Sequence, residues 1–157
     1  IVRKSLELGN IAEQLLIQKL EEFNIQAFKN EDKSKRSYFD IFADIGGLNT
    51  TFEVKYDLMA AKTGNIAIEF FNSKSKKPSG IGITEADYWV HVLKIDNVNT
   101  IFICTVAELK EFIKSTKPKR IVYGGGDNNA DILLFEIDRM ICFKEFDDEF
   151  KRIITKK

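Results

Sequence analysis

The chain has 157 residues, of which 44% are hydrophobic and 31% charged, and 24 lysines and arginines balance 24 aspartates and glutamates. This length and composition predict one globular domain over residues 1–157 and exclude a disordered or fibrous chain. One histidine and two cysteines are too few for a zinc hydrolase or a disulfide scaffold, and no apolar run or leader pattern suggests a membrane span or a signal peptide, so we expect a cytoplasmic protein.

The first half of the chain predicts one helix followed by strands. Residues 6–23 have the apolar spacing of an amphipathic helix. Glycines and an asparagine at 46–49 tolerate positive φ and predict a hairpin turn. A short apolar stretch follows at 25–28, and the strand-like segments of this half are 38–45, 50–56, 66–71 and 88–95. A basic, serine-rich loop is expected at 72–82 and a helical turn at 84–87.

The second half predicts a strand–helix–strand arrangement. Thr105 and Glu108 have the spacing of a capping box, so a helix should occupy 106–115. Further strands are expected at 100–105, 120–123, 131–137 and 140–143, and a basic helix at 147–157. Together with the first half, this order predicts an α/β (α+β) fold with a mixed central sheet flanked by helices. His91, Trp89 and the phenylalanines are expected in the core.

The predicted hairpin gathers charged side chains. A turn centred on Gly47 and Leu48 places Ile45 opposite Thr50. The same alignment places Phe42 opposite Glu53, and Asp40 opposite Lys55. Because side chains alternate along a strand, Asp40, Glu53 and Lys55 then share one face, and a slip of one residue would separate them.

Two carboxylates on one face repel each other unless a cation lies between them. Mg²⁺ typically takes one or two carboxylates, keeps some of its waters and binds substrate phosphate oxygens. Such an ion polarises a phosphodiester and activates water. Asp40 and Glu53 are therefore candidate Mg²⁺ ligands, and Lys55 is a candidate for orienting the attacking water or offsetting phosphate charge.

Glu13 lies within the apolar arc of the first predicted helix, where a carboxylate is costly unless it is paired or bound to a metal. Gly9, one turn earlier, allows close backbone approach. We therefore expect Glu13 to reach the hairpin face and to complete the acidic cluster. Asp44 shares the face of Asp40 and is the alternative ligand, and Glu69 on the next strand is a candidate supporting residue.

The segments Gly9-Asn-Ile-Ala-Glu13, Phe39-Asp40 and Glu53-Val-Lys55 resemble the motifs of the PD-(D/E)XK nuclease superfamily. The resemblance implies a restriction-endonuclease-like αβββαβ core over about residues 6–95, with 100–157 as a C-terminal elaboration. It also implies that Asp40 and Glu53 bind Mg²⁺, that Lys55 serves the attacking water, and that Glu13 supports the metal. Phe39 stands at the tolerant position of the motif's proline. The beginning is similar to archaeal Holliday-junction resolvases, and 62–81 to phage, restriction and homing-type members.

Basic residues near these segments are candidate DNA contacts, since lysine and serine side chains commonly bind phosphate. They are Lys33, Lys35, Arg36, Lys74, Lys76, Lys77 and Ser79. We expect a Mg²⁺-dependent DNA endonuclease in which Mn²⁺ can substitute. Cleavage of both strands by one small site per chain suggests a homodimer or higher oligomer.

Three alternatives stay open: a structure-selective Holliday-junction resolvase, a catalytically inactive nucleic-acid-binding module of the same fold, and a protein-interaction domain with solvated hairpin charges. The composition, rich in lysine, isoleucine, asparagine and phenylalanine, suggests an AT-rich source such as a phage or mobile element.

Overall fold

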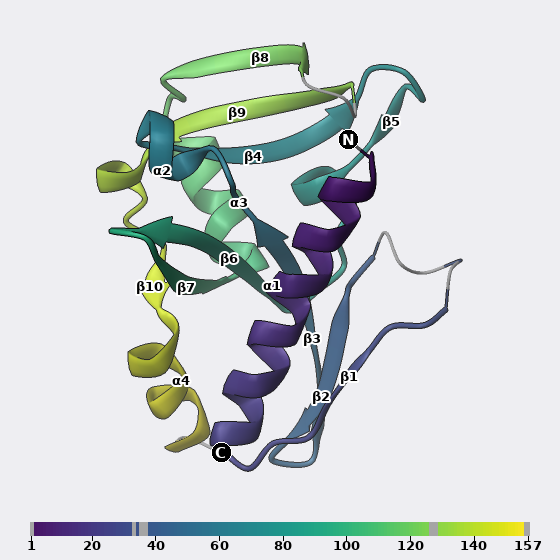
Figure 1. Cartoon of the computed structure of the whole chain (residues 1–157), viewed down its shortest axis with the longest axis vertical. Helices are drawn as coiled ribbons and strands as arrows, with labels where there is room; N and C mark the ends of the chain where they lie inside the picture. Colours follow the sequence, from purple (N-terminus) through teal and green to yellow (C-terminus); the bar gives the residue numbers. More distant parts are fainter. Residues whose placement is uncertain (1, 33, 35–37, 126–128, 156–157) are drawn as a thin grey trace.

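The computed structural model describes residues 2–32, 34, 38–125 and 129–155, which form helices and two β-sheets (Figure 1). The six-stranded sheet, here called sheet A, has the order β1-β2-β3-β6-β7-β10, and the four-stranded sheet B has the order β5-β4-β9-β8. The helices are α1 (Val2–Glu22), α2 (Ala60–Thr63), α3 (Val106–Ser115) and α4 (Phe146–Thr155), with 3-10 turns η2 (Gly80–Gly82) and η3 (Ile137–Arg139).

Sheet A is mixed, as the sequence predicts. Its strands are β1 (Ala27–Lys29), β2 (Ile41–Ile45), β3 (Leu48–Tyr56), β6 (Tyr88–Ile95), β7 (Val98–Thr105) and β10 (Lys144–Glu145). β3 and β6 pair in parallel, and the other neighbours are antiparallel. Sheet B contains β4 (Asn65–Asn72), β5 (Lys77–Pro78), β8 (Arg120–Gly125) and β9 (Ala130–Glu136), all antiparallel. The mixed α+β class is thus confirmed.

Sheet A separates two hydrophobic cores. In β2, Ile41, Ala43 and Ile45 are buried and join one core with residues of α1 and α4. On the opposite face, Trp89 of β6 packs in a second core with α3 and sheet B. Figure 1 shows α1 lying across sheet A, with sheet B above α3. Among the described helices, none combines the length and the apolarity that crossing a membrane requires.

The hairpin turn differs from the prediction by a register shift of two residues. Ile45 pairs with Leu48, and Phe42 pairs with Thr51 rather than Glu53. The reason is a two-residue turn in which Gly46 (φ 61°) and Gly47 (φ 85°) both adopt positive φ, as a type I′ turn requires. Since a shift of two residues preserves side-chain alternation, the predicted faces survive while the predicted partners change.

Two predicted elements are wrong. Residues 84–87 are not helical, because the backbone of Asp87 donates to the carbonyl of Thr51 and its carboxylate accepts from the backbone N–H of Thr51. Residues 140–143 form a turn, closed by a hydrogen bond from the Phe143 N–H to the Met140 carbonyl, rather than a strand.

The connection between β3 and β6 also differs from the expected αβββαβ order. Its only α-helix is the four-residue α2, and its strands β4 and β5 belong to sheet B rather than to sheet A.

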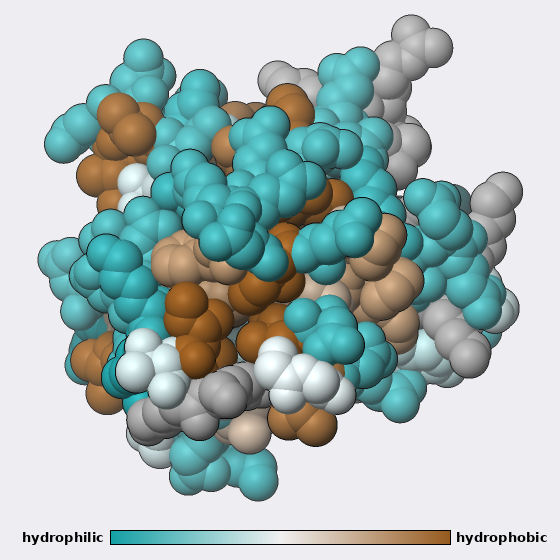
Figure 2. Space-filling model, turned by 90° about the horizontal axis from the view of Figure 1, so that it is seen from below, coloured by the Kyte–Doolittle hydropathy of each residue, from teal (hydrophilic) through white to brown (hydrophobic). Residues whose placement is uncertain are grey.

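Exposed hydrophobic residues gather near the α4 end of the molecule. Figure 2 views this end and shows hydrophobic residues near the middle of the face, with hydrophilic residues around them. Leu48, at the hairpin turn, is 60% exposed.

Phe28 of β1 is 47% exposed and stacks on Phe42, so the expectation that the phenylalanines lie in the core is wrong for Phe28.

Candidate functional site

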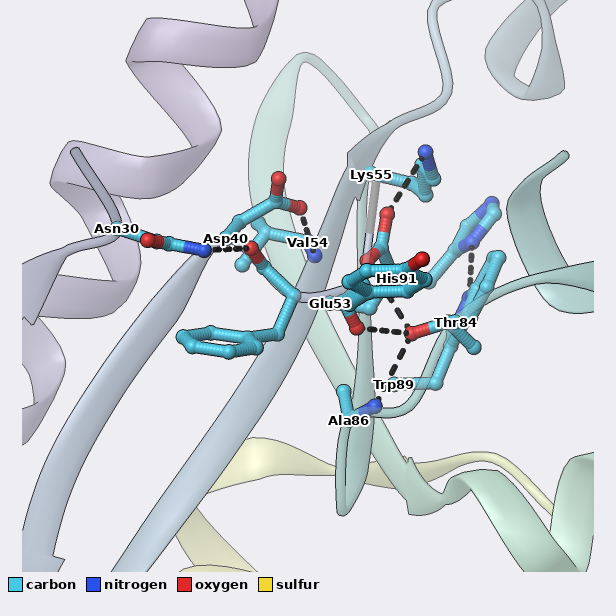
Figure 3. Close-up of polar contacts among 11 residues, drawn as sticks. Asn30, Asp40, Glu53, Val54, Lys55, Thr84, Ala86, Trp89 and His91 are labelled. Atoms are coloured by element: carbon cyan, nitrogen blue, oxygen red, sulfur yellow. Dashed lines mark hydrogen bonds and ion pairs between the residues drawn. The ribbon is translucent and has the colours of Figure 1, made fainter. Parts of the chain in front are cut away.

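Asp40 lies where the backbone pairing of β2 with β3 ends. Its N–H donates to the carbonyl of Phe52 (2.9 Å), and its carboxylate Oδ2 accepts from the N–H of Val54 (2.8 Å). The carboxylate thus takes the place of a ladder carbonyl, which satisfies a backbone donor and fixes the side chain beside β3. Asn30 holds this segment from the other side by donating its N–H to the Asp40 carbonyl and its amide to the Phe39 carbonyl (Figure 3).

Glu53 is 4% exposed and lies on the face of β3 that points away from α1. Its Oε1 is 3.2 Å from the Thr84 hydroxyl, and its Oε2 is 3.0 Å from Lys55 Nζ. Burial raises the pKa of Glu53 from 4.5 to about 7. The charge of Asp40 adds to this rise, while Lys55 and the hydrogen bond from Thr84 oppose it. The site therefore holds an acid whose charge is poorly stabilised near neutral pH.

Lys55 extends from the same face as Glu53. Burial lowers the pKa of its ammonium, but the charges of Glu53 and Asp40 raise it by more, so the pKa lies above its ordinary value. Lys55 is therefore fully charged at neutral pH. It can offset phosphate charge or hold a water molecule by donating a hydrogen bond, but it cannot serve as a base there.

Glu69, the candidate supporting residue, lines the same cavity as Lys55. The cavity has a volume of about 310 Å³, and its walls also include Met59, Trp89, His91 and Ile132. It precedes a β-bulge in β4, and η2 packs directly against that bulge. A Cβ at Gly80 would lie 2.2 Å from the Glu69 carbonyl oxygen, and Gly80 has φ +52°, so only glycine fits. The charge of Glu69 contributes to the raised pKa of Lys55.

Glu13 is buried, as its place in the apolar arc predicts, and its Oε1 lies 3.9 Å from Lys29 Nζ. Lys29 pairs with Ile41, whose side chain faces α1, so this ion pair lies on the α1 side of sheet A. Glu53 and Lys55 lie on the other side. Within the described ranges, no three His, Cys, Asp or Glu side chains are close enough to hold one metal ion. Glu13 is therefore not gathered with Asp40 and Glu53.

The other predicted residues are dispersed. Lys74 and Lys76 are exposed in the turn between β4 and β5, Lys77 is exposed at the start of β5, and half-buried Ser79 follows that strand. Lys33, Lys35 and Arg36 lie outside the described residues. Asp44 is exposed and accepts from the Gly47 N–H at 2.8 Å, which gives it a role in the hairpin turn.

Sequence reasoning missed Thr84, which is 4% exposed and contacts Glu53. Its hydroxyl lies 3.0 Å from the carbonyl of Tyr38 and accepts from the Ala86 N–H at 3.2 Å. A threonine four residues before a strand carries no signal of such a contact, because 31 residues separate it from Glu53.

The donor set at Asp40 and Glu53 fits a hard divalent cation. Both ligands are carboxylates, and their mutual repulsion contributes to the raised pKa of buried Glu53, which a bound cation would lower. With two protein carboxylates, the remaining coordination positions would fall to backbone carbonyl oxygen, water and substrate, the pattern that Mg²⁺ prefers.

Comparison with known proteins identifies a fold and no family. No protein-family model matches the chain, and no similar sequence was found among curated proteins. Among solved structures, the chain is similar to a bacterial homing endonuclease, I-Ssp6803I, with a TM-score of 0.53 and 13% sequence identity over 94% of this chain and 93% of that one. The likeness establishes that this chain shares the fold of that protein along nearly its whole length.

Proposed function

We propose that the protein is a metal-dependent DNA endonuclease of the PD-(D/E)XK type that hydrolyses phosphodiester bonds with a water nucleophile. The observation that carries this proposal is the convergence of Asp40, Glu53 and Lys55, with the Lys55 ammonium 3.0 Å from Glu53 and the charge of Asp40 acting on both. Two carboxylates and one ammonium at the end of the β2–β3 pairing are groups suited to hydrolysis, and the predicted motif contains the same residues.

Asp40 and Glu53 would hold Mg²⁺, or Mn²⁺ in its place, with the carbonyl of Val54 as a further ligand. When bound, the ion would supply positive charge to polarise the phosphodiester and lower the pKa of a water. The buried Glu53 carboxylate must be ionised to bind, and its pKa of about 7 makes ionisation easy to complete at slightly alkaline pH.

Lys55 would orient the attacking water or neutralise charge that develops on the phosphate. Glu69 would act on Lys55 from across the shared cavity. For Glu13, which lies on the α1 side of the sheet, we propose a supporting role through the backbone of the hairpin. The basic turn at Lys74, Lys76, Lys77 and Ser79 and the basic segment at Lys33, Lys35 and Arg36 would contact DNA phosphates.

The similar solved structure supports the endonuclease assignment, since that protein is a homing endonuclease. Duplex cleavage by one small site per chain further suggests that two or more copies act together as a homo-oligomer. We infer an intracellular site of action, where DNA is found, and a phage or mobile element as the source.

The test is cleavage of supercoiled plasmid with Mg²⁺ or Mn²⁺. Lys55→Ala and Asp40→Ala should each lower the cleavage rate on the order of 10²- to 10⁴-fold. Lys110→Ala and Glu111→Ala, exposed on α3, are the matched controls and should cleave like the wild type. Equal rates in all five proteins would point to a contaminant and contradict the proposal.

Binding without cleavage by the wild type would identify the catalytically inactive module instead. Faster cleavage of a synthetic four-way junction than of linear duplex would favour the resolvase.

A further inference from the structure

Trp89 is the chain's single tryptophan, and it lies beneath Lys55. Its side chain is completely buried, and the centre of the indole ring is 5.9 Å from Lys55 Nζ, within the range of a cation–π interaction. The parallel pairing of β3 with β6 places Trp89 beside Glu53 and His91 beside Lys55. The Lys55 ammonium therefore contacts both the Glu53 carboxylate, as Figure 3 shows, and the aromatic face of Trp89.

Hydrogen bonds fix the orientation of the indole. The Trp89 Nε1–H can only donate, so His91 Nδ1, 3.1 Å away, must accept. The ring proton of neutral His91 is then on Nε2, which donates to Asp57 Oδ2 at 2.8 Å. The two rings are nearly parallel, at 16°, with their centres 6.3 Å apart.

Asp57 is itself held by backbone. Its Oδ1 accepts from the N–H of Ala60, at the start of α2, and its Oδ2 accepts from the N–H of Ala67, in β4. Its own N–H donates to the carbonyl of Val92. Asp57 is 7% exposed and His91 is 1% exposed, so water competes little for these bonds. A buried chain of contacts thus runs from the backbone of α2 and β4 through two side chains to the indole.

We propose that Asp57, His91 and Trp89 act as positioning residues that hold the Lys55 ammonium against Glu53. Without an anchored indole, the flexible lysine side chain would be free to turn toward Glu69 or into the adjoining cavity. The catalytic consequence rests on the proposed endonuclease function, whereas the placement of Lys55 does not.

Two substitutions of His91 test its hydrogen bond to Asp57 and its hydrogen bond to Trp89 separately. The amide nitrogen of His91→Gln reaches the place of Nε2 and keeps the bond to Asp57, but the bond to Trp89 is lost. The amide oxygen of His91→Asn reaches the place of Nδ1 and keeps the Trp89 bond, but leaves Asp57 short of a donor. A stabilising network alone would make His91→Asn at least as damaging to activity as His91→Gln.

Nuclear magnetic resonance can measure the placement of the Lys55 side chain independently of any cleavage activity. The ε-methylene protons of Lys55 should resonate upfield of those of exposed Lys110, because the indole ring shields them. His91→Gln should abolish this shift and His91→Asn should preserve most of it, and the single indole N–H resonance reports which variant keeps the Trp89 hydrogen bond. Trp89→Phe keeps a ring but loses the N–H donor, so it should reduce the shift even if the His91 variants do not fold.

Plasmid cleavage measures the consequence. His91→Gln should lower kcat on the order of 10- to 100-fold with little change in KM, and His91→Asn should lower kcat less while losing more thermal stability. A Lys55 methylene shift that is unchanged in His91→Gln and Trp89→Phe would overturn the inference, as would equal kcat in His91→Gln and the wild type. If the wild type does not cleave, the proposed function fails and the methylene shift alone decides the positioning inference.

Discussion

Two polar clusters lie side by side on the same face of sheet A, and they differ in how well their groups are satisfied. In the cluster of Asp57, His91 and Trp89, each carboxylate oxygen and the ring nitrogens have hydrogen-bond partners in the buried interior. In the cluster of Asp40, Glu53 and Lys55, burial works against the charge of Glu53, and its pKa rises to about 7.

The difference separates two uses of buried polarity. A fully hydrogen-bonded network fixes one arrangement of the surrounding strands and gains little from any ligand. A buried carboxylate beside a second carboxylate retains an electrostatic cost that a bound cation would remove. We therefore expect substitutions of Asp57, His91 and Trp89 to lower stability and to affect activity only through the placement of Lys55. Substitutions of Asp40, Glu53 and Lys55 should act directly on activity and on the response to pH.

Glu53→Gln should change the pH dependence of stability most. The pKa of Glu53 is about 4.5 in the unfolded chain and about 7 in the folded protein, so the folded state binds more protons across this window. Wild-type stability should then fall relative to Glu53→Gln as pH rises from 4.5 to 7 and stay level above 7, a change on the order of 3 kcal/mol.

Chemical denaturation of both proteins at several pH values measures this change. A stability difference that does not vary with pH would mean that Glu53 is ionised at its ordinary pKa, and the contrast between the two clusters would be lost.

Asp57→Asn tests the satisfied cluster. The amide nitrogen replaces one acceptor oxygen, so the N–H of Ala60 or Ala67, or the His91 ring, loses its partner in the interior. The free energy of unfolding should fall by about 2 kcal/mol. Asp96→Asn, in the exposed turn between β6 and β7, is the matched control, and asparagine suits its φ of 51°. Equal losses in the two variants would contradict the role assigned to Asp57.

The cluster of Asp40, Glu53 and Lys55 was largely predictable from sequence because it depends on local rules. Alternation along two strands of one hairpin is enough to place Asp40, Glu53 and Lys55 on one face, and it survived the error in register because the shift was an even number of residues. The position of Glu13 could not be settled in this way, since the face of the sheet that a helix covers is decided by long-range packing.

The cluster of Asp57, His91 and Trp89 was not predictable beyond the burial of His91 and Trp89. His91 and Trp89 read correctly as core residues, but their contacts with Asp57 and Lys55 arise from the parallel pairing of β3 with β6, across a connection that contains α2 and sheet B strands. Neither strand spacing nor composition determines that pairing. The same long-range contact brings Thr84 to Glu53.

Thr84→Val probes this link between the segment before β6 and Glu53, and should have the smallest effect. Valine keeps the shape but leaves the N–H of Ala86 without its acceptor, which should lower the free energy of unfolding by about 1 kcal/mol at pH 5. The Thr84 hydroxyl lowers the pKa of Glu53, so the variant should raise that pKa further, and its stability deficit should grow between pH 5 and pH 8.

Thr84→Ser keeps the hydroxyl, so the pH dependence of its stability should match that of the wild type. Thr100→Val makes the same substitution on β7, away from Glu53, and serves as the control. A deficit that is constant with pH would show that Thr84 supports only the loop. A growing deficit would show that the carboxylate at the candidate site is tuned by a residue 31 positions away along the chain.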